Sequence, residues 1–448
     1  MQDIFDYIDQ HAQEYVQTLR VLCRQPSIAA QNLGMEETAA MVVDLLRQVG
    51  SDVRCFATAG FPILYGTLPG RSDKTLAFYN HYDVQPPEPL ELWESDPFAA
   101  KVRDGRIWAR GVADNKGNLV ARICAVDAYQ KVRGQLPLQV KFIFEGEEEI
   151  GSANLATFAQ EHPDLVAADG CIWESGYKDP RGRPQICLGV KGNYYVELHA
   201  TGARSDLHSS WGGVVPNPIW RLVWALSLIK SRDERILIPG FYDAIREPTP
   251  AELTALEQLD FDEAGTLRRM GLSQFLARLS GIPLLVKHLF QPTCTVCGIS
   301  GGYDGPGVKT VLPNHAWLKL DFRLVPDQDP DQVHQQLRLH LDAHGFQDVE
   351  LHPLPSSYPA RTPMDDPLVH IVTEAAREVH GVEPMVYPLT AGSGPMYELC
   401  QRFGVPAVST GVGNAESHTH APNENIVITD FIQGVKHIAL IMERFAAV

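Results

Sequence analysis

The sequence lacks the features that mark several classes of protein. No segment approaches the roughly 20 consecutive apolar residues of a membrane-spanning helix, and the acidic N-terminal segment lacks the basic start and apolar core of a signal peptide. Basic residues are outnumbered, with 38 Lys and Arg against 55 Asp and Glu, so the net charge is −17. Such a chain is poorly suited to bind nucleic acid or an anionic membrane. We therefore expect neither as a partner.

Cysteine is also sparse. The eight cysteines are scattered over 448 residues, unlike the dense set of a disulfide-stabilised secreted domain. A reducing, cytoplasmic location is therefore expected. Cys294 and Cys297 have the CxxC spacing of metal and redox sites, but no second pair accompanies them. We expect a strand with two small buried thiols there.

With 448 residues, the chain is long enough for two domains. Since 44% of the residues are hydrophobic, it can bury large cores. Strand-like runs alternate with helical patterns in its first part, which predicts an α/β domain with a mixed, mostly parallel sheet flanked by helices. The expected helices cover residues 3–24, 36–49 and 117–130, and the expected strands cover residues 62–67, 75–80 and 138–144.

The pattern changes after about residue 187. Residues 194–200 and 316–323 alternate between apolar and polar side chains, as half-exposed antiparallel strands do. Helical stretches at 218–231 and 330–344 accompany them, and helices at 366–379 and 429–445 follow. We expect an α+β domain, residues 188–361, inserted into a domain made of residues 1–187 and 362–448.

One acidic segment is the most informative part of the chain. Residues 140–144 are typical of a buried strand, and Glu145, Glu147, Glu148 and Glu149 follow at once. Crowded carboxylates at the end of a buried strand repel one another and lose hydration. A bound cation would offset that cost, so the segment predicts a metal site if the chain supplies further ligands.

Other segments carry side chains able to bind a metal. His81 and Asp83 lie two residues apart, so on a strand they point the same way, and a carboxylate beside an imidazole ligand fixes its tautomer. Asp114 lies between glycines before a predicted helix, where capping of that helix is the alternative. Glu174 ends another apolar run.

A late polar loop holds His418 and His420, which could instead face solvent. Together with the acidic segments, it completes a set rich in carboxylates with two histidines. Such a set suits two borderline cations close together better than one structural zinc, which prefers cysteine-rich tetrahedra.

The order and spacing of these motifs resemble the aminoacylase, carnosine dipeptidase and glutamate carboxypeptidase family of co-catalytic zinc hydrolases, which includes succinyl-diaminopimelate desuccinylase. The dipeptidase branch is the nearest. The matching motifs are His81-x-Asp83, Gly111-x-x-Asp114-Asn115-Lys116-Gly117, Glu148-Glu149-x-Gly151-Ser152 and His420. The resemblance implies a zinc-peptidase fold whose inserted domain, residues 188–361, serves as a lid and a dimerisation domain.

The resemblance also implies a role for each motif residue. Asp83 clamps the ring of His81, Asp114 bridges two metals and precedes a cis peptide bond, and Glu148 is the general base. Glu145 and Glu147 have no direct role, and His418 is the rival of His420. The implied metal ligands are His81, Asp114, Glu149, Glu174 and His420.

Three further matches concern the substrate. His208 resembles the histidine that reaches the active site of the other subunit of a homodimer and polarises the scissile carbonyl. Arg323 resembles the residue that holds a substrate carboxylate. The alternative is that it merely forms an ion pair with Asp321 on the same strand. The loop with Gly392, Ser393 and Gly394 resembles one that donates hydrogen bonds to the same carboxylate, or it could be a plain turn.

The implied reaction is hydrolysis of an amide bond by a water that bridges two divalent metal ions. Zn²⁺ is expected, and Mn²⁺ or Co²⁺ are alternatives. The expected substrates are dipeptides or short peptides with a free C-terminal carboxylate. The alternatives are N-acyl amino acids, cleaved by a deacylase or desuccinylase of the same mechanism, and a non-catalytic binding protein on the same fold.

Overall fold

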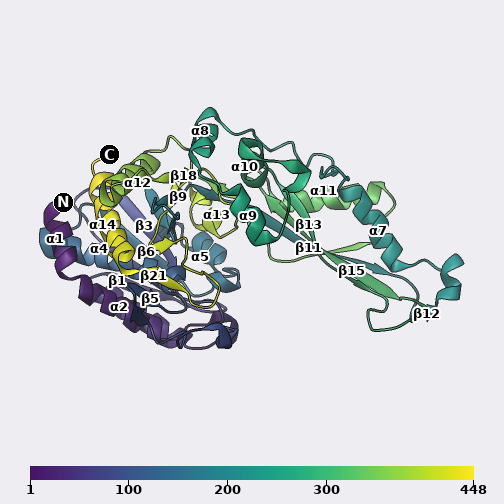
Figure 1. Cartoon of the computed structure of the whole chain (residues 1–448), viewed down its shortest axis with the longest axis horizontal. Coiled ribbons are helices and arrows are strands. Elements are labelled where there is room, and N and C mark those ends of the chain that lie inside the picture. Colours follow the sequence, from purple (N-terminus) through teal and green to yellow (C-terminus); the bar gives the residue numbers. More distant parts are fainter. The chain divides into compact units, whose positions relative to one another are not determined.

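The computed structural model describes residues 1–448, and the chain divides into two compact units. The first unit comprises residues 1–189, 361–389 and 395–448, and the second comprises residues 190–360 together with the short segment 390–394. Figure 1 shows both units in the colours of the sequence. Each unit has a hydrophobic core of its own.

An eight-stranded mixed sheet forms the centre of the first unit. Its strands, in order across the sheet, are β1 (Asp52–Phe56), β2 (Ile63–Leu68), β6 (Gln139–Glu145), β3 (Thr75–His81), β7 (Gly170–Trp173), β19 (Ala407–Ser409), β9 (Gln185–Cys187) and β18 (Met385–Tyr387). The central strands β6, β3, β7 and β19 run parallel, whereas β1 and β2 pair antiparallel at one side. Every residue of β3 is buried, as expected of a parallel strand covered on both faces.

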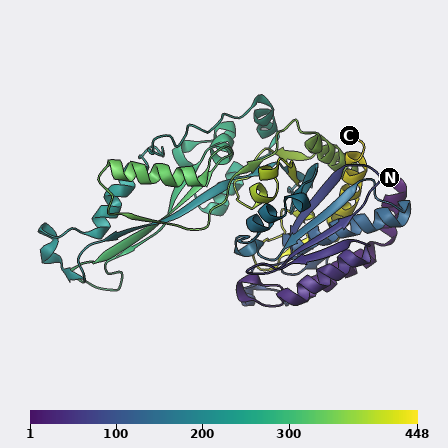
Figure 2. The ribbon, with the colours of Figure 1, turned by 180° about the vertical axis from the view of Figure 1, so that it is seen from behind.

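Helices cover this sheet, as seen from behind in Figure 2. Helix α4 packs against β3 and α14, and α12 packs against α14 and β19. The helices of the first unit are α1 (Gln2–Gln10), α2 (Ala12–Arg24), α3 (Met35–Gln48), α4 (Gly117–Arg133), α5 (Leu155–Glu161), α6 (Pro163–Val166), α12 (Pro367–His380), α13 (Met396–Leu399) and α14 (Ile428–Phe445). None of the helices is both long and apolar enough to cross a bilayer.

Two small sheets lie outside the main one in the first unit. They consist of β4 (Lys101–Arg103), β5 (Arg106–Trp108) and β21 (Asn425–Val427), and of β8 (Tyr177–Lys178) and β20 (Gly413–Asn414). The chain passes between the units within β10 (Gly189–Val190) and β17 (Ala360–Arg361).

The second unit is built on a four-stranded antiparallel sheet with the order β13 (Thr293–Gly301), β15 (His315–Leu324), β11 (Gly192–Thr201) and β16 (Glu350–Pro353). Buried and half-buried residues alternate along β11, because helices α7 and α11 cover one face of the sheet. Its helices are α7 (Pro218–Ile229), α8 (Pro250–Gln258), α9 (Glu263–Met270), α10 (Gly281–Phe290) and α11 (Pro330–Ala343), and β12 (Leu207–His208) pairs with β14 (Val311–Leu312).

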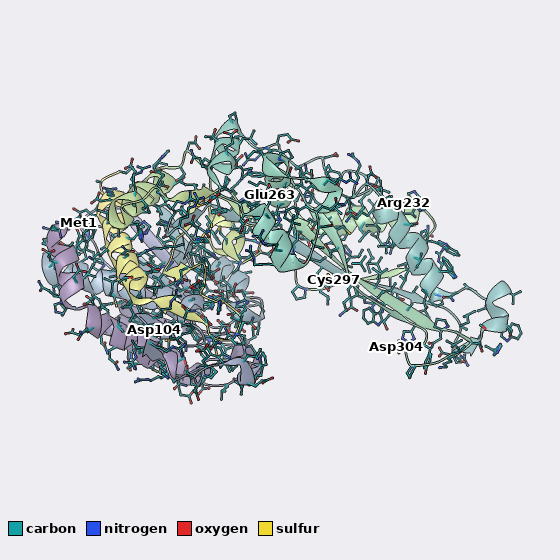
Figure 3. All side chains as sticks on the ribbon, in the orientation of Figure 1. Met1, Asp104, Arg232, Glu263, Cys297 and Asp304 are labelled. Carbon is teal, nitrogen blue, oxygen red and sulfur yellow. The ribbon has the colours of Figure 1, made fainter.

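The mixed, mostly parallel sheet with flanking helices is confirmed, and the expected elements recur within a few residues of their bounds. Several details differ. Strands β1, β9, β18 and β19 of the main sheet were not expected, and the first helix is divided at His11 into α1 and α2. The prediction of two buried thiols on β13 is half wrong, because Cys294 is buried whereas Cys297, labelled in Figure 3, is exposed. A register shift between Val296 and Gly298 changes the alternation of the strand at that point.

Candidate metal centre

The candidate site lies at the carboxyl ends of three adjacent parallel strands of the first unit. His81 is the last residue of β3, and Glu174 directly follows β7. Glu148 and Glu149 lie in a short 3₁₀ turn after β6. Because parallel strands β6, β3 and β7 end at the same edge of the sheet, their following residues meet there, which is the usual place for sites in α/β sheets.

Asp114 reaches this edge from a kinked turn, Val112–Lys116, that leads into α4, and Asp114 itself has an extended backbone (φ −131°, ψ 90°). Gly111 before it has a φ of +81°, in the left-handed region that favours glycine. The Asp114–Asn115 peptide bond is cis, as the resemblance implies. The alternative of a plain helix cap does not apply, because α4 has no side-chain cap and the Asp114 carboxylate contacts two imidazoles instead.

His420 arrives from the loop between β20 and β21, where its φ is +60°. Its Nε2 lies 3.1 Å from Oδ2 of Asp114 and 3.2 Å from Oε2 of Glu149. His418, the rival residue, is exposed, as His420 also is, but only His420 contacts these carboxylates. The loop therefore brings His420 to the cluster.

The two oxygens of Asp114 face two different sets of side chains. Oδ1 lies 3.0 Å from Nε2 of His81, which in turn is 4.0 Å from Oε2 of Glu174. Oδ2 lies 3.1 Å from Nε2 of His420, which in turn is 3.2 Å from Oε2 of Glu149. By distance alone, ligand atoms of His81, Asp114 and Glu149 also lie within 4.8 Å of one another. We favour the division into two sets because each imidazole directly contacts a different oxygen of Asp114.

Asp83 supports both His81 and the acidic turn after β6. Its Oδ1 lies 3.3 Å from Nδ1 of His81, while its two oxygens accept the backbone N–H groups of Glu148 (3.3 Å) and Glu149 (3.0 Å). The side chain is fully buried. One carboxylate thus orients the imidazole and fixes the backbone of the acidic turn.

The electrostatics of the cluster show a large excess of carboxylate. Burial, together with the nearby Asp114, Glu149 and Asp83, raises the pKa of Glu148 to about 7. Burial and the charge of Glu148 raise the pKa of Glu174 well above its usual value. Hydrogen bonds to Asp114 and Glu149 raise the pKa of His420 to about 10. The cluster therefore holds more carboxylates than its two imidazoles can balance in charge.

The residues fit a pair of divalent cations. Oε1 of Glu149 and Oε2 of Glu174 are buried without a hydrogen-bond partner, although a buried carboxylate oxygen ordinarily has one. Ligand atoms about 2.0–2.2 Å from a common ion stand about 3–3.5 Å apart, which matches the 3.0–3.2 Å contacts around Asp114. Imidazole and carboxylate ligands suit Zn²⁺ and related ions.

The predicted substrate residues all belong to the second unit. Arg323 on β15 donates Nε–H to Oδ2 of Asp321 (2.9 Å) and Nη1–H to Oγ of Ser393 (2.8 Å). The carbonyl of Gly392 accepts the backbone N–H of Lys191 (2.8 Å). The structure thus brings Arg323 together with the segment that contains Gly392, Ser393 and Gly394. His208 on β12 is exposed, with Nε2 at 3.2 Å from Oγ1 of Thr310.

Sequence reasoning missed residues that support the cluster. Gln85 donates to Oε2 of Glu149 (2.9 Å). Arg122, which is 1% exposed, donates to the carbonyl of Glu174 (2.9 Å), as Asn115 also does (3.1 Å). A polar residue close to a motif, such as Gln85, could have been suspected. No pattern in the sequence relates Arg122 to Glu174, because they meet only through helix packing.

Comparison with known proteins agrees with this geometry. A model of Peptidase family M20/M25/M40 matches residues 77–444. The chain belongs to this family. It is therefore a metallopeptidase, and its assignment to the family that the motifs resemble is confirmed.

Its relatives in this peptidase family include proteins of known structure. The chain is 38% identical to the M20 family metallo-carboxypeptidase Sso-CP2 from Sulfolobus solfataricus, with a TM-score of 0.90 over 97% of this chain and 100% of that one. Human carnosine dipeptidase 1 is 27% identical, with a TM-score of 0.78 over 100% and 99% of the two chains. The Beta-Ala-His dipeptidase of Rattus norvegicus is 30% identical over 98% of this chain and 94% of its own.

Proposed function

We propose that this peptidase hydrolyses dipeptides or short peptides with a free C-terminal carboxylate and that it needs two divalent metal ions. The observation that carries the proposal is Asp114, whose two oxygens each contact a different imidazole, while each imidazole lies within 4.0 Å of a further carboxylate. A carboxylate placed between two ligand sets in this way can bind two ions that lie close together, as two-metal sites hold them. The relatives named above as dipeptidases and a carboxypeptidase support the substrate class.

His81, Glu174 and Oδ1 of Asp114 would hold one ion, and Oδ2 of Asp114, Glu149 and His420 would hold the other. Such ions would lower the pKa of a bound water toward about 7 and polarise a carbonyl. Zn²⁺ is the expected metal, with Mn²⁺ and Co²⁺ as alternatives. Asp83 serves the chemistry indirectly, because it keeps Nδ1 of His81 protonated and leaves Nε2 free to bind a metal.

Glu148 is the general base in this proposal. Its backbone N–H is held by Asp83, so its carboxylate starts from a fixed point beside the ligands. It accepts a proton from the attacking water and returns it to the leaving nitrogen, as one carboxylate can do in both steps of a hydrolysis. The proposed ligands around it would bind the metal ions, and only Glu148 would transfer the proton.

The second unit would recognise the substrate. The Arg323 guanidinium can bind a carboxylate through two N–H groups, and Ser393, Gly392 and Gly394 would complete the recognition with hydroxyl and backbone donors. His208 would polarise the scissile carbonyl of the partner subunit. A homodimer is thus part of the proposal.

Exposed apolar residues of the second unit support a homodimer. Trp220 and Trp224 stack on the outer side of α7 and are 55% and 51% exposed. Strand β13 is an edge strand that exposes Val296 and Ile299. An exposed apolar edge strand favours pairing with another chain.

A cytoplasmic location is also part of the proposal. The eight cysteines form no disulfide bond, as expected of a protein in a reducing compartment.

A substrate panel tests the proposal. The protein, stripped with a chelator and reloaded with Zn²⁺, Mn²⁺ or Co²⁺, is assayed on dipeptides, tripeptides, dipeptide amides, and N-acetyl and N-succinyl amino acids. We expect hydrolysis of the free dipeptides, loss of activity on chelation and poor turnover of the amides. Preferred cleavage of the acyl amino acids would instead establish a deacylase. Absence of hydrolysis with every metal would contradict an enzymatic function.

A further inference from the structure

Glu424 is a fully buried carboxylate that receives four hydrogen bonds. Its Oε2 accepts Nη1–H of Arg110 and the backbone N–H of Gly111, both at 2.8 Å. Its Oε1 accepts the backbone N–H groups of Ala113 (2.8 Å) and Asp114 (3.1 Å). The side chain is 0% exposed, so no water competes for these donors. The backbone of the loop that carries Asp114 is therefore bound to one side chain at three residues, Gly111, Ala113 and Asp114.

The charge of this carboxylate is balanced at the same place. Arg110 is 1% exposed and forms an ion pair with Glu424. A buried carboxylate without a partner would be strongly destabilising. Arg110 itself is held from the other side by the carbonyl of Pro86. The Arg110–Glu424 pair is thus a buried ion pair, and neither of its side chains belongs to the proposed metal ligands.

The position of Glu424 links two distant segments. It lies four residues after His420 in sequence, and it binds the loop of Asp114, 310 residues away. Asp114 and His420 are the two side chains whose contact, at 3.1 Å, defines the second metal position. Glu424 therefore ties the backbone that carries one ligand to the backbone that carries the other.

We propose that Glu424 is a positioning residue, which sets the separation of Asp114 and His420 before a cation binds. The inference rests on the proposed metal-dependent function. It goes beyond the ligand set, because Glu424 touches neither a metal position nor the substrate. Outer residues that orient ligands in this way typically change metal affinity or activity by about 10–100-fold when replaced.

The substitution Glu424→Gln tests this with little change in volume. Each oxygen of Glu424 accepts two hydrogen bonds, so an amide nitrogen in either place would face two donors. Asp179→Asn is a matched control in the same unit. Asp179 is 8% exposed and accepts the backbone N–H groups of Arg181 (2.9 Å) and Arg183 (2.8 Å) and the Nε–H of Arg183 (2.7 Å).

Metal binding is the decisive measurement. Chelator-treated wild type, Glu424→Gln and Asp179→Asn are titrated with Co²⁺, followed by visible absorption, and with Zn²⁺, followed by calorimetry. We expect Glu424→Gln to bind one of two equivalents about 10–100-fold more weakly, with a lower kcat, a nearly unchanged KM and partial rescue by excess metal. Asp179→Asn should bind both equivalents as wild type does.

Two results would overturn the inference. The first is a folded Glu424→Gln protein that binds both equivalents with wild-type affinity. The second concerns the wild type alone, so it does not require the variant to fold. In that result, the amide hydrogens of Gly111, Ala113 and Asp114 exchange freely with solvent in the metal-free protein and become protected only when metal is added. A wild type that binds no metal would instead contradict the proposed function.

Discussion

At the scale of the residue, neighbouring carboxylates in one short segment lie in different surroundings. Glu145 is buried and accepts the hydroxyls of Tyr79 (2.5 Å) and Ser152 (2.9 Å). Glu147 accepts the amide of Asn154 (2.7 Å). Glu149 faces His420. None of these neighbours forms a hydrogen bond with the carboxylate of Glu148, to which we assign the proton transfer as a proposal.

Replacement of Glu148 by Gln should separate metal binding from turnover. An amide of the same size cannot accept the proton, so we expect kcat to fall by about 10²–10⁴-fold, the usual contribution of a general base. The metal content should remain that of the wild type, because Glu148 is not among the proposed ligands. Steady-state kinetics and metal analysis of the purified variant check both parts.

Glu147→Gln is the control for this substitution. It alters the adjacent acidic residue, which is buried but bonded to Asn154 rather than to the ligands, so its activity should stay near that of the wild type. Near-wild-type turnover by Glu148→Gln would contradict the assignment of the base. Loss of metal from Glu148→Gln would show that Glu148 is a ligand.

At the scale of the element, the strands and helices were largely predictable because their patterns are local. The all-buried strand β3 and the half-buried strand β11 follow directly from their apolar and alternating sequences. The break between α1 and α2 was not predictable, since the apolar spacing continues through His11. Strand β1 was missed because its residues are mostly exposed at the edge of the sheet.

Helix α14 carries a buried histidine that should make the fold sensitive to acid. His437 is fully buried, and its Nε2 lies 3.0 Å from the carbonyl of Val372 on α12. Burial disfavours the charged imidazole and lowers the pKa of His437 to about 4. The unfolded chain, with a pKa near 6.5, therefore binds a proton between about pH 6.5 and 4 that the folded protein does not.

The stability contributed by neutral His437 is accordingly complete above about pH 6.5 and is lost as the pH falls toward 4. The loss amounts to about 3 kcal/mol. His437→Gln keeps a donor for Val372 and should reduce the pH dependence of the free energy of unfolding in this window. Urea unfolding from pH 4 to 7.5, with chelator present to remove metal effects, measures it.

Ile441→Val is the packing control in the same helix. It should lower the free energy of unfolding by about 0.5–1.5 kcal/mol at every pH, because it removes one buried methylene and no titrating group. An equally steep pH dependence in wild type and His437→Gln would exclude His437 as the source of acid sensitivity.

At the scale of the whole molecule, the proposed metal ligands and the proposed substrate-binding residues are carried by different units of the chain. The proposed metal ligands all belong to the first unit, whereas His208, Arg323 and Ser393 belong to the second. Ser393 lies in residues 390–394, a short segment that joins the second unit although the sequence on both sides of it belongs to the first. No local pattern marks that assignment.

Mixing two inactive variants tests whether His208 acts across a homodimer. In a mixed dimer of His208→Ala and Glu148→Gln, one site would combine the intact Glu148 of one subunit with the intact His208 of the other. We expect each variant alone to be impaired, and a re-equilibrated mixture to regain up to about a quarter of wild-type activity, because half of the dimers are mixed and each holds one complete site.

The oligomeric state is checked by analytical ultracentrifugation of the same samples. Mixing two preparations of the same variant is the control, and it should restore nothing. Equal inactivity of the heterologous mixture, in dimers shown to have exchanged subunits, would place the action of His208 within its own subunit. A purely monomeric wild type would exclude the dimer altogether.

The sequence by itself determined the residue types at the site, the family and most elements, because these depend on short spacings and on local apolar patterns. The tertiary structure alone decided which oxygen of Asp114 faces which imidazole, how Arg122 supports Glu174 and how Glu424 binds the loop of Asp114. Those contacts join residues from 33 to 310 positions apart. They depend on the direction of individual N–H groups and oxygens, which only the packed backbone fixes.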